Sequence, residues 1–216
     1  IIYVACSTVM SVIMTVSAAY LVSRKKWLWR SELNILLTFH MFIGGGIIPF
    51  YLLIRDLGMI NTRWALIVPG ALVIWNMVVL RTAMEGIPDS LEESARLDGA
   101  GDMVILFHII LPLIKAAMAV QILFYVVNAW NAWFNASIFI RDRNLMPLQI
   151  IMREVLIDND AQSMVGIDFT DANNVARYSV LTKYCMIMIA TVPILVVYPF
   201  LQKYFVKGMM VGSVKG

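Results

Sequence analysis

The sequence predicts an all-α protein that crosses a membrane several times, and two observations support this. Hydrophobic residues make up 61% of the 216 residues and charged residues only 14%, whereas soluble domains are roughly 45–50% apolar and about 25% charged. A helix needs about 20 residues to cross a hydrocarbon core about 30 Å thick. Five largely uncharged stretches approach that length: 1–22, 33–54, 64–80, 116–140 and 178–202.

This composition excludes several other classes of protein. The charged residues are too few to cover the surface of a soluble enzyme or to keep a chain disordered. A net charge of +3 is too small to indicate a protein that binds nucleic acid. The chain does not begin with Met and its first 23 residues carry no charge, so we expect no signal peptide and interpret the start as truncated. Residues 1–216 are predicted to form a single transmembrane domain.

Lys and Arg in the connections predict the orientation of the spans, because basic residues resist translocation. The connection 23–30 holds four basic residues, and the connection 55–63 holds two. We therefore place the first connection in the cytoplasm and the second outside. Alternation of the later spans then places 81–115 inside the cell and 141–177 outside.

Glycine and proline occur inside three of the spans, at Gly44–Gly46, Pro69–Gly70 and Pro193. Membrane helices tolerate such residues where neighbouring groups satisfy the freed backbone, so we expect helix packing and mild kinking. The alternative is that the three consecutive glycines form the hinge of a moving gate.

The cytoplasmic segment 85–112 concentrates charges and helix-capping residues. Ser90 followed by Glu93 is typical of a capping box, and Gly99 is typical of a left-handed helix stop, so we expect a short helix over 89–98. One side of this helix is small and mildly apolar, which lets the backbone of another protein approach closely. The alternative is a solvated loop without a partner.

The residues that follow are nearly free of acids and bases. His108 is the only acidic or basic residue within 103–114, and this segment is too short to span a membrane. We expect them to lie along the membrane surface and to lead into the fourth span.

The spacing within this cytoplasmic loop argues for a partner. Glu93-Ser94-Ala95, three residues, Gly99, nine residues and then Ile109-Ile110-Leu111-Pro112 resemble the EAA-x3-G-x9-I-x-L-P signature of binding-protein-dependent ABC importer permeases. Ser94 stands where the signature has Ala, and every other fixed position agrees.

The resemblance extends over nearly the whole chain. It includes residues 45–58, Trp130-Asn131 and 204–208, and it is to the smaller, MalG-like permease subunit of carbohydrate-type importers. Within that family, residues 146–155 and 198–208 look most like the branch of LplC and YtcP, which is linked to polysaccharide fragments and is similar to alginate- and pectin-type importers. The resemblance implies the transmembrane domain of a type I, MetI-like importer with six spans, of which this chain would hold five and lack the first.

The family also implies partners in a bacterial inner membrane. They are a homologous second permease subunit, two ABC ATPase subunits, an extracytoplasmic solute-binding protein and an oligosaccharide substrate. No Gly-x4-Gly-Lys-Ser/Thr motif occurs in the sequence, so ATP and Mg²⁺ are expected on the ATPase and no cofactor on this chain. By the same resemblance, the short helix docks on the ATPase, with these coupling residues: Glu92, Glu93, Ser94, Ala95, Asp98, Gly99, Ala100 and Pro112.

The fourth span carries a row of polar side chains, Tyr125, Asn128, Asn131 and Asn135, beside Trp130. At about 100° per residue the four polar residues fall on roughly one helical face. Two interpretations stay open: hydrogen bonds between helices, or the polar wall of a path for sugar. A sugar cargo would suit the second interpretation, because sugar hydroxyl groups bind amides and sugar rings stack on aromatic faces.

The external segment 141–177 is too long for a simple connection, so a functional role is expected. The resemblance implies contact with the binding protein, and Arg141, Arg143 and Arg153 are the candidates. If the cargo is a polyuronate, these arginines are expected to meet its carboxylates. The alternative is a solvated surface loop.

Two other classes of membrane protein are alternatives. An ion-coupled secondary transporter would need ionisable groups within its spans, and an intramembrane enzyme would need a nucleophile, a base or a metal set. His40, Cys6 and Cys185 do not form such a set by their spacing, so we predict no catalytic and no metal-binding residues.

Overall fold

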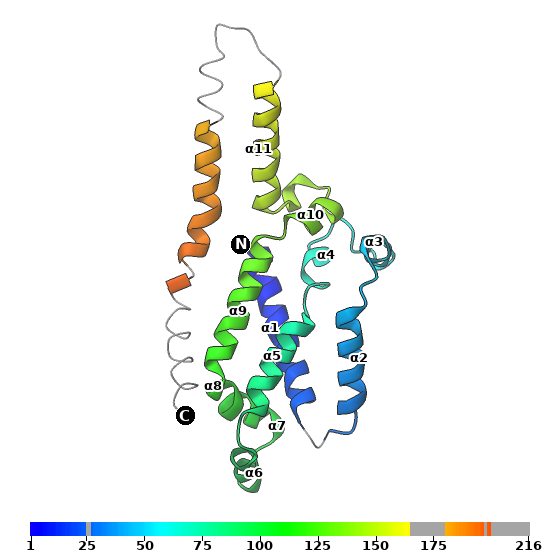
Figure 1. Cartoon of the computed structure of the whole chain (residues 1–216), viewed down its shortest axis with the longest axis vertical. Helices are drawn as coiled ribbons and strands as arrows, with labels where there is room; N and C mark the ends of the chain where they lie inside the picture. The colour runs from blue at the N-terminus through cyan, green and yellow to red at the C-terminus, as the bar shows by residue number, and fades with distance from the viewer. Residues whose placement is uncertain (25–26, 165–179, 197, 200–216) are drawn as a thin grey trace.

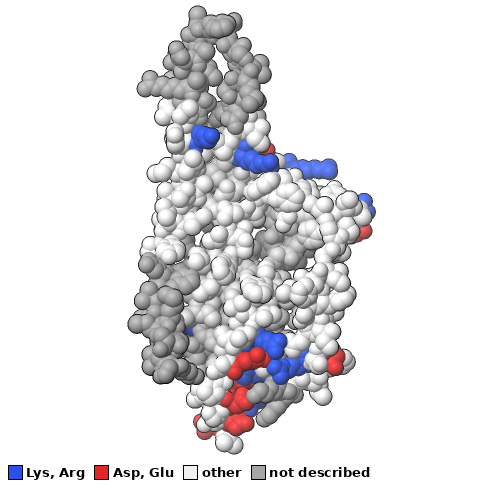
Figure 2. Space-filling model, viewed as in Figure 1, with Lys and Arg blue, Asp and Glu red and all other residues white. Residues whose placement is uncertain are grey.

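The computed structural model describes residues 1–24, 27–164, 180–196 and 198–199. Every regular element within these residues is a helix. Helices α1, α5 and α9 stand side by side at the centre of an elongated molecule, with α6 at one end and α11 at the other (Figure 1). Charged residues on the visible face gather towards these two ends and leave an uncharged band between them (Figure 2). The arrangement agrees with the predicted all-α membrane protein.

Helix α1 (Ile2–Ser23) confirms the first predicted span, because it is unbroken and long and apolar enough to cross a membrane. It packs mainly against α5 (Ile74–Glu85) and α9 (Lys115–Trp130). Ala19 of α1, together with Met77 and Leu80 of α5, is almost completely buried in the main hydrophobic core. The core therefore sits around α1, close to the end of the bundle that carries α6.

The second predicted span is broken rather than mildly kinked. Helix α2 (Arg30–Phe42) and helix α3 (Ile47–Asp56) meet at 118°. Residues 43–46 are not helical, and Gly46 has a φ of +75° and a ψ of 175°. Essentially only glycine adopts this backbone conformation. The glycine run therefore separates the two helices and lets α3 begin at a steep angle to α2.

The third and fourth predicted spans are also interrupted. The third consists of α4 (Trp64–Ile67) and α5, and the fourth consists of α9 and α10 (Trp133–Phe139). Pro69 lies in the first break and lacks the N–H that a continuing helix would use. The described part of the fifth span is an apolar helix, Val180–Val196.

The first predicted span is therefore one continuous helix, whereas the second, third and fourth contain breaks where mild kinks were predicted. By length and composition, the described residues contain one unbroken crossing helix, or up to three crossings if each strongly bent helix pair counts as one.

At the end of the bundle that carries the segment predicted to be cytoplasmic, α6 (Asp89–Leu97) confirms the predicted short helix to within one residue. It is followed by a continuous helical run made of α7 (Asp102–Val104), η1 (Ile105–Ile110) and α8 (Leu111–Leu113). This run meets α9 at 87°, so it is a separate short helix that leads into the fourth span, as predicted. Its residues Ile105 and Ile110 are buried in the main core.

At the opposite end, a second hydrophobic cluster joins α3, α4 and α10 through Ile54, Ala65 and Phe139. Asn61, whose φ is +59°, ties the adjacent loop to this cluster. Its backbone N–H donates to the Phe139 carbonyl (2.8 Å), and its side-chain Oδ1 accepts from the Asp142 N–H (2.8 Å). At this end of the bundle, the connections are therefore held in place by hydrophobic packing and by hydrogen bonds.

The segment predicted to be external begins as a short 3-10 turn, η2 (Arg143–Leu145), and continues as α11 (Leu148–Met164). Its first half is thus helical, and α11 projects away from the bundle (Figure 1). The remainder of the predicted segment, 165–177, lies outside the described residues.

We predict that Gly46→Ala lowers the free energy of unfolding by about 1–3 kcal/mol, because an L-residue is strained in this backbone conformation. Gly44→Ala is the matched control. An added Cβ meets nothing within 4 Å at either position, and only Gly46 has a positive φ. Thermal unfolding in detergent measures both variants, and equal midpoints would contradict the assigned role of Gly46.

Candidate functional site

Helix α6 starts differently from its prediction. Pro88 is the N-cap residue, with a φ of −58°, and no side chain caps the helix. Ser90 is already inside the helix, so the predicted capping box with Glu93 is wrong. The first turn instead carries the acidic residues Asp89 and Glu92, which are favourable near the positive end of the helix dipole.

Helix α6 ends as predicted, with Gly99 in the left-handed region at a φ of +84°. The Gly99 N–H donates to the Arg96 carbonyl (3.0 Å), and the Ala100 N–H donates to the Ala95 carbonyl (2.9 Å). This pair of bonds is the Schellman motif, which commonly brings together the side chains at the positions of Ala95 and Ala100. Both alanines pack against the main core. The motif thus gives a physical reason for an alanine and a glycine at this spacing.

The two sides of α6 differ in exposure. Ala95 and Glu92 face the body of the protein, and the Glu92 side chain is only 15% exposed. Five of the exposed residues lie on one side, which we call the free face of α6: Ser90, Glu93, Ser94, Leu97 and Asp98. Leu97 is 90% exposed, although sequence reasoning did not select it. Its position one turn after Glu93 was the available signal.

The remaining coupling candidates lie just beyond the free face. Gly99 is exposed and Ala100 is half-buried. Pro112 lies in α8, near the 87° bend that leads into α9. The predicted coupling residues on α6 and its stop therefore fall into an outward group and an inward group, the latter being Glu92, Ala95 and Ala100, while Pro112 is exposed on α8.

Glu92, on the inward side of α6, belongs to a network of charged side chains. Glu92 is paired with Arg24, at the end of α1, and accepts a hydrogen bond from Arg96 (3.0 Å). Arg96 is also paired with Asp102 of α7. The hydrogen bonds to Glu92 and Asp102 raise the pKa of the Arg96 guanidinium above its ordinary value. The Arg96 guanidinium therefore stays charged, and the network links three segments of the chain.

A second candidate site is a cavity of about 350 Å³ between α1, the α4–α5 break, α9 and α10. The polar residues that line it are Tyr3, Ser7, Ser11, Tyr125, Asn128 and Asn135. Tyr125 is buried, and its hydroxyl shares a hydrogen bond with the Thr15 hydroxyl (2.6 Å). Ser11 donates to the Gly70 carbonyl at the helix break (3.3 Å). Three of the five predicted path residues therefore share one cavity.

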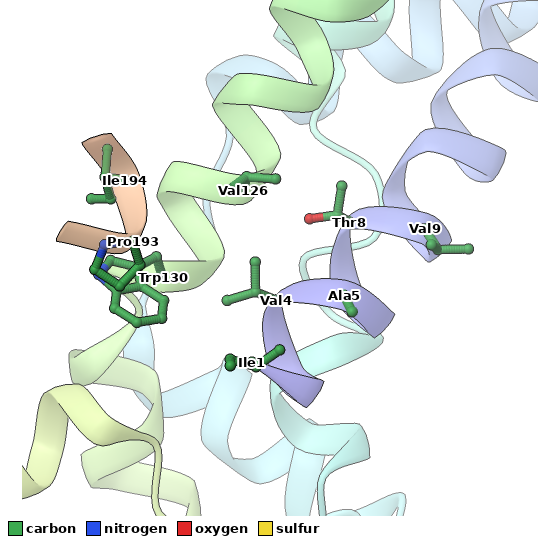
Figure 3. Close-up of a pocket in the computed structure, with 9 residues that line it drawn as sticks. All are labelled: Ile1, Val4, Ala5, Thr8, Val9, Val126, Trp130, Pro193 and Ile194. Atoms are coloured by element: carbon green, nitrogen blue, oxygen red, sulfur yellow. The ribbon is translucent and has the colours of Figure 1, made fainter. Parts of the chain in front are cut away.

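The other two predicted path residues lie elsewhere. Asn131 is the C-cap of α9, where the helical periodicity that placed it on the polar face ends. Trp130 lines a different, apolar cavity of about 330 Å³, together with Pro193 and Ile194 (Figure 3). Its indole N–H donates to the Ala190 carbonyl (3.0 Å). Trp130 thus ties α9 to the helix at 180–196.

The three predicted binding-protein contacts lie at the outer end. Arg141 and Arg143 are exposed in the connection between α10 and α11. Arg153 projects from α11, and its guanidinium carbon lies 3.9 Å from the centre of the Trp133 ring. Figure 2 shows Lys and Arg gathered in this part of the visible face. A basic surface of this kind attracts acidic partners or acidic cargo.

The structure offers no metal site within the described residues, where no group of three or more His, Cys, Asp or Glu side chains has a suitable arrangement. Cys6 and Cys185 are both exposed on apolar helices.

Comparison with known proteins identifies the family of the chain. Residues 7–211 match the family described as binding-protein-dependent transport system inner membrane component. The chain is 37% identical over 209 residues to the polygalacturonan/rhamnogalacturonan transport system permease protein YtcP of Bacillus subtilis, covering 97% of this chain and 72% of that protein. It is 39% identical to protein LplC of the same organism, covering 97% and 70%.

A solved structure has the same fold. It is the crystal structure of a bacterial ABC transporter involved in the import of the acidic polysaccharide alginate, with a TM-score of 0.82 and 30% identity, covering 94% of this chain and 72% of that chain. With the signature helix, the interrupted spans and these matches together, the chain belongs to the family of inner membrane components of binding-protein-dependent transport systems.

Proposed function

We propose that this chain is a multi-pass permease subunit of an ATP-driven importer of oligosaccharides, including acidic fragments such as those of alginate or pectin. One observation carries the proposal: α6 packs against η1 and is paired with the end of α1, and α1 also lines the polar cavity. A change in the position of α6 therefore has a direct structural route to the cavity wall. The relatives named for polygalacturonan and alginate support an acidic cargo.

The partners follow from this role. The free face of α6 docks on one of two ATPase subunits, which bind ATP and Mg²⁺, while this chain holds no cofactor. A homologous second permease subunit completes the path through the bacterial inner membrane. A solute-binding protein delivers the sugar to the outer end, where Arg141, Arg143 and Arg153 contact the binding protein or its cargo. Neither an ion-coupled transporter nor an intramembrane enzyme is favoured, since the family match is to binding-protein-dependent systems.

Gly99→Ala is expected to reduce binding-protein-stimulated ATP hydrolysis by about tenfold, because a left-handed alanine costs roughly 1–2 kcal/mol at the end of α6. Gly101→Ala is the matched control, since an added Cβ meets nothing within 4 Å at either position and only Gly99 has a positive φ. Gly99→Asn should restore most of the stimulation, because asparagine tolerates this region. Hydrolysis by the assembled transporter is the measurement, and equal rates for both alanine variants would exclude the role of Gly99.

Asn128→Leu is expected to lower sugar uptake several-fold, up to about tenfold, while leaving assembly with the ATPase unchanged, because it removes a hydrogen-bonding group from the cavity wall. Asn131→Leu provides the control, since Asn131 lies in the same segment but outside the cavity lining. Uptake into proteoliposomes and co-purification of the ATPase measure the two effects. A larger loss of uptake with Asn131→Leu would contradict the assignment of the path.

The acidic cargo is tested with a uronic oligosaccharide and its methyl ester, which share one backbone and differ in charge. We predict that the transporter takes up oligogalacturonate faster than the ester. We also predict that replacing Arg141, Arg143 and Arg153 together by Gln narrows this difference, since guanidinium groups bind carboxylates in charge-assisted pairs. Equal uptake of both sugars by the native chain would argue for a neutral cargo.

A further inference from the structure

The charged network beside α6 closes on itself. Arg24 is paired with Glu92, Glu92 with Arg96, and Arg96 with Asp102. The Tyr20 hydroxyl then donates to the Asp102 carbonyl (3.4 Å), and the Arg24 guanidinium lies 4.8 Å from the centre of the Tyr20 ring. The end of α1 is therefore joined to α6 through Arg24 and to α7 through Tyr20, and the contacts form a closed ring of residues.

Within this ring, the contact between α1 and α6 is the pair formed by Arg24 and Glu92. The two side chains are only 21% and 15% exposed. The Nε and Nη2 atoms of Arg24 are buried and have no hydrogen-bond partner within the described part of the chain. Glu92 is the acidic partner of Arg24 in this ring, and breaking the pair removes that counter-charge from a largely buried guanidinium.

Helix α1 extends from this pair to the polar cavity. The same helix carries Thr15, which bonds to Tyr125, and Ser7 and Ser11, which line the cavity wall. It is the one unbroken helix of membrane-spanning length and composition among the described residues. A continuous helix moves as a rigid element, whereas the interrupted segments can bend at their breaks.

We propose that the Arg24–Glu92 pair is the joint through which a displacement of α6 reaches the cavity wall, with α1 as the rigid connecting element. Arg24 and Glu92 are positioning residues: they act on the path through α1 and touch neither nucleotide nor sugar. The sequence resemblance suggested Glu92 as a contact of the ATPase, whereas its buried carboxylate suits an internal link. The inference rests on the proposed function, because it assumes that α6 moves with the ATPase.

The matched control is a second pair at the same end of the bundle. Arg30 of α2 is paired with Glu85 of α5 (2.6 Å), and their side chains are 28% and 32% exposed. This pair has similar chemistry and joins α2 to α5, while Arg30 also donates to the Val22 carbonyl of α1 (2.9 Å). If the loss of any surface charge pair impairs transport, the variants of both pairs will lower sugar uptake per ATP hydrolysed. If the Arg24–Glu92 pair is the joint, only its variants will do so.

The experiment reverses each charge pair in the complete transporter, assembled with its ATPase, second permease subunit and binding protein. The variants are Arg24→Glu, Glu92→Arg and the double variant, together with Arg30→Glu, Glu85→Arg and their double variant. Three quantities are measured: co-purification of the ATPase, ATP hydrolysis with and without binding protein, and sugar uptake in proteoliposomes.

Each single reversal at Arg24 or Glu92 is expected to leave co-purification and basal hydrolysis within about twofold and to lower uptake per ATP hydrolysed by about tenfold. The double variant that combines Arg24→Glu with Glu92→Arg should recover most of this ratio. Recovery is incomplete because the guanidinium introduced at position 92 faces that of Arg96 one turn away. The variants at Arg30 and Glu85 should keep a ratio near that of the native chain.

Three results would overturn the proposal. They are an unchanged ratio in the single reversals, loss of the ATPase together with the loss of uptake, or a double variant no better than the singles. The test is separable from that of the cargo. If the native transporter takes up a neutral oligosaccharide but not the uronic sugar, the ratio of neutral sugar uptake to ATP hydrolysed still reports on the joint, and only the proposed substrate fails.

Discussion

The packing of α1 between α5 and α9 is the constraint on which the rest of the structure depends. Ala19 and Val22 of α1 are almost fully buried there, and small or branched side chains of this kind let helices approach closely. Since α1 also lines the polar cavity and is paired with α6, its position sets the geometry of both candidate sites. Without this contact, α6 and the cavity would be separate features of the molecule.

The helix breaks and the cavity are two aspects of one arrangement. Non-helical backbone at membrane depth is tolerated only where it is buried in protein or faces water. Pro69 and Gly70 of the first break line the cavity, as does Ala132 of the second. Ser11 donates to the carbonyl that Gly70 leaves without a helical partner. The interruptions of the third and fourth spans thus supply polar backbone to the wall of the proposed sugar path.

Helix α6 shows how a signature can describe structure and interaction at once. Ala95 and Gly99 belong to the helix stop and its packing, because the Schellman geometry needs a left-handed residue and close contact with the core. Glu93 and Ser94 lie on the free face, where a partner can reach them. Substitution of Ala by Ser at position 94 therefore changes an exposed surface and leaves the turn intact.

The sequence by itself determined the fold class, the short helix α6 with its stop at Gly99, and the family. These depend on composition, local backbone preference and spacing, which are properties of neighbouring residues. The tertiary structure alone decided that the span with Gly44–Gly46 is broken by 118°, that Asn131 leaves the polar face, and that Glu92 points inward to Arg24. Each of these outcomes depends on contacts or on a helix end that periodicity cannot locate, because helical spacing assigns a face only while the helix continues.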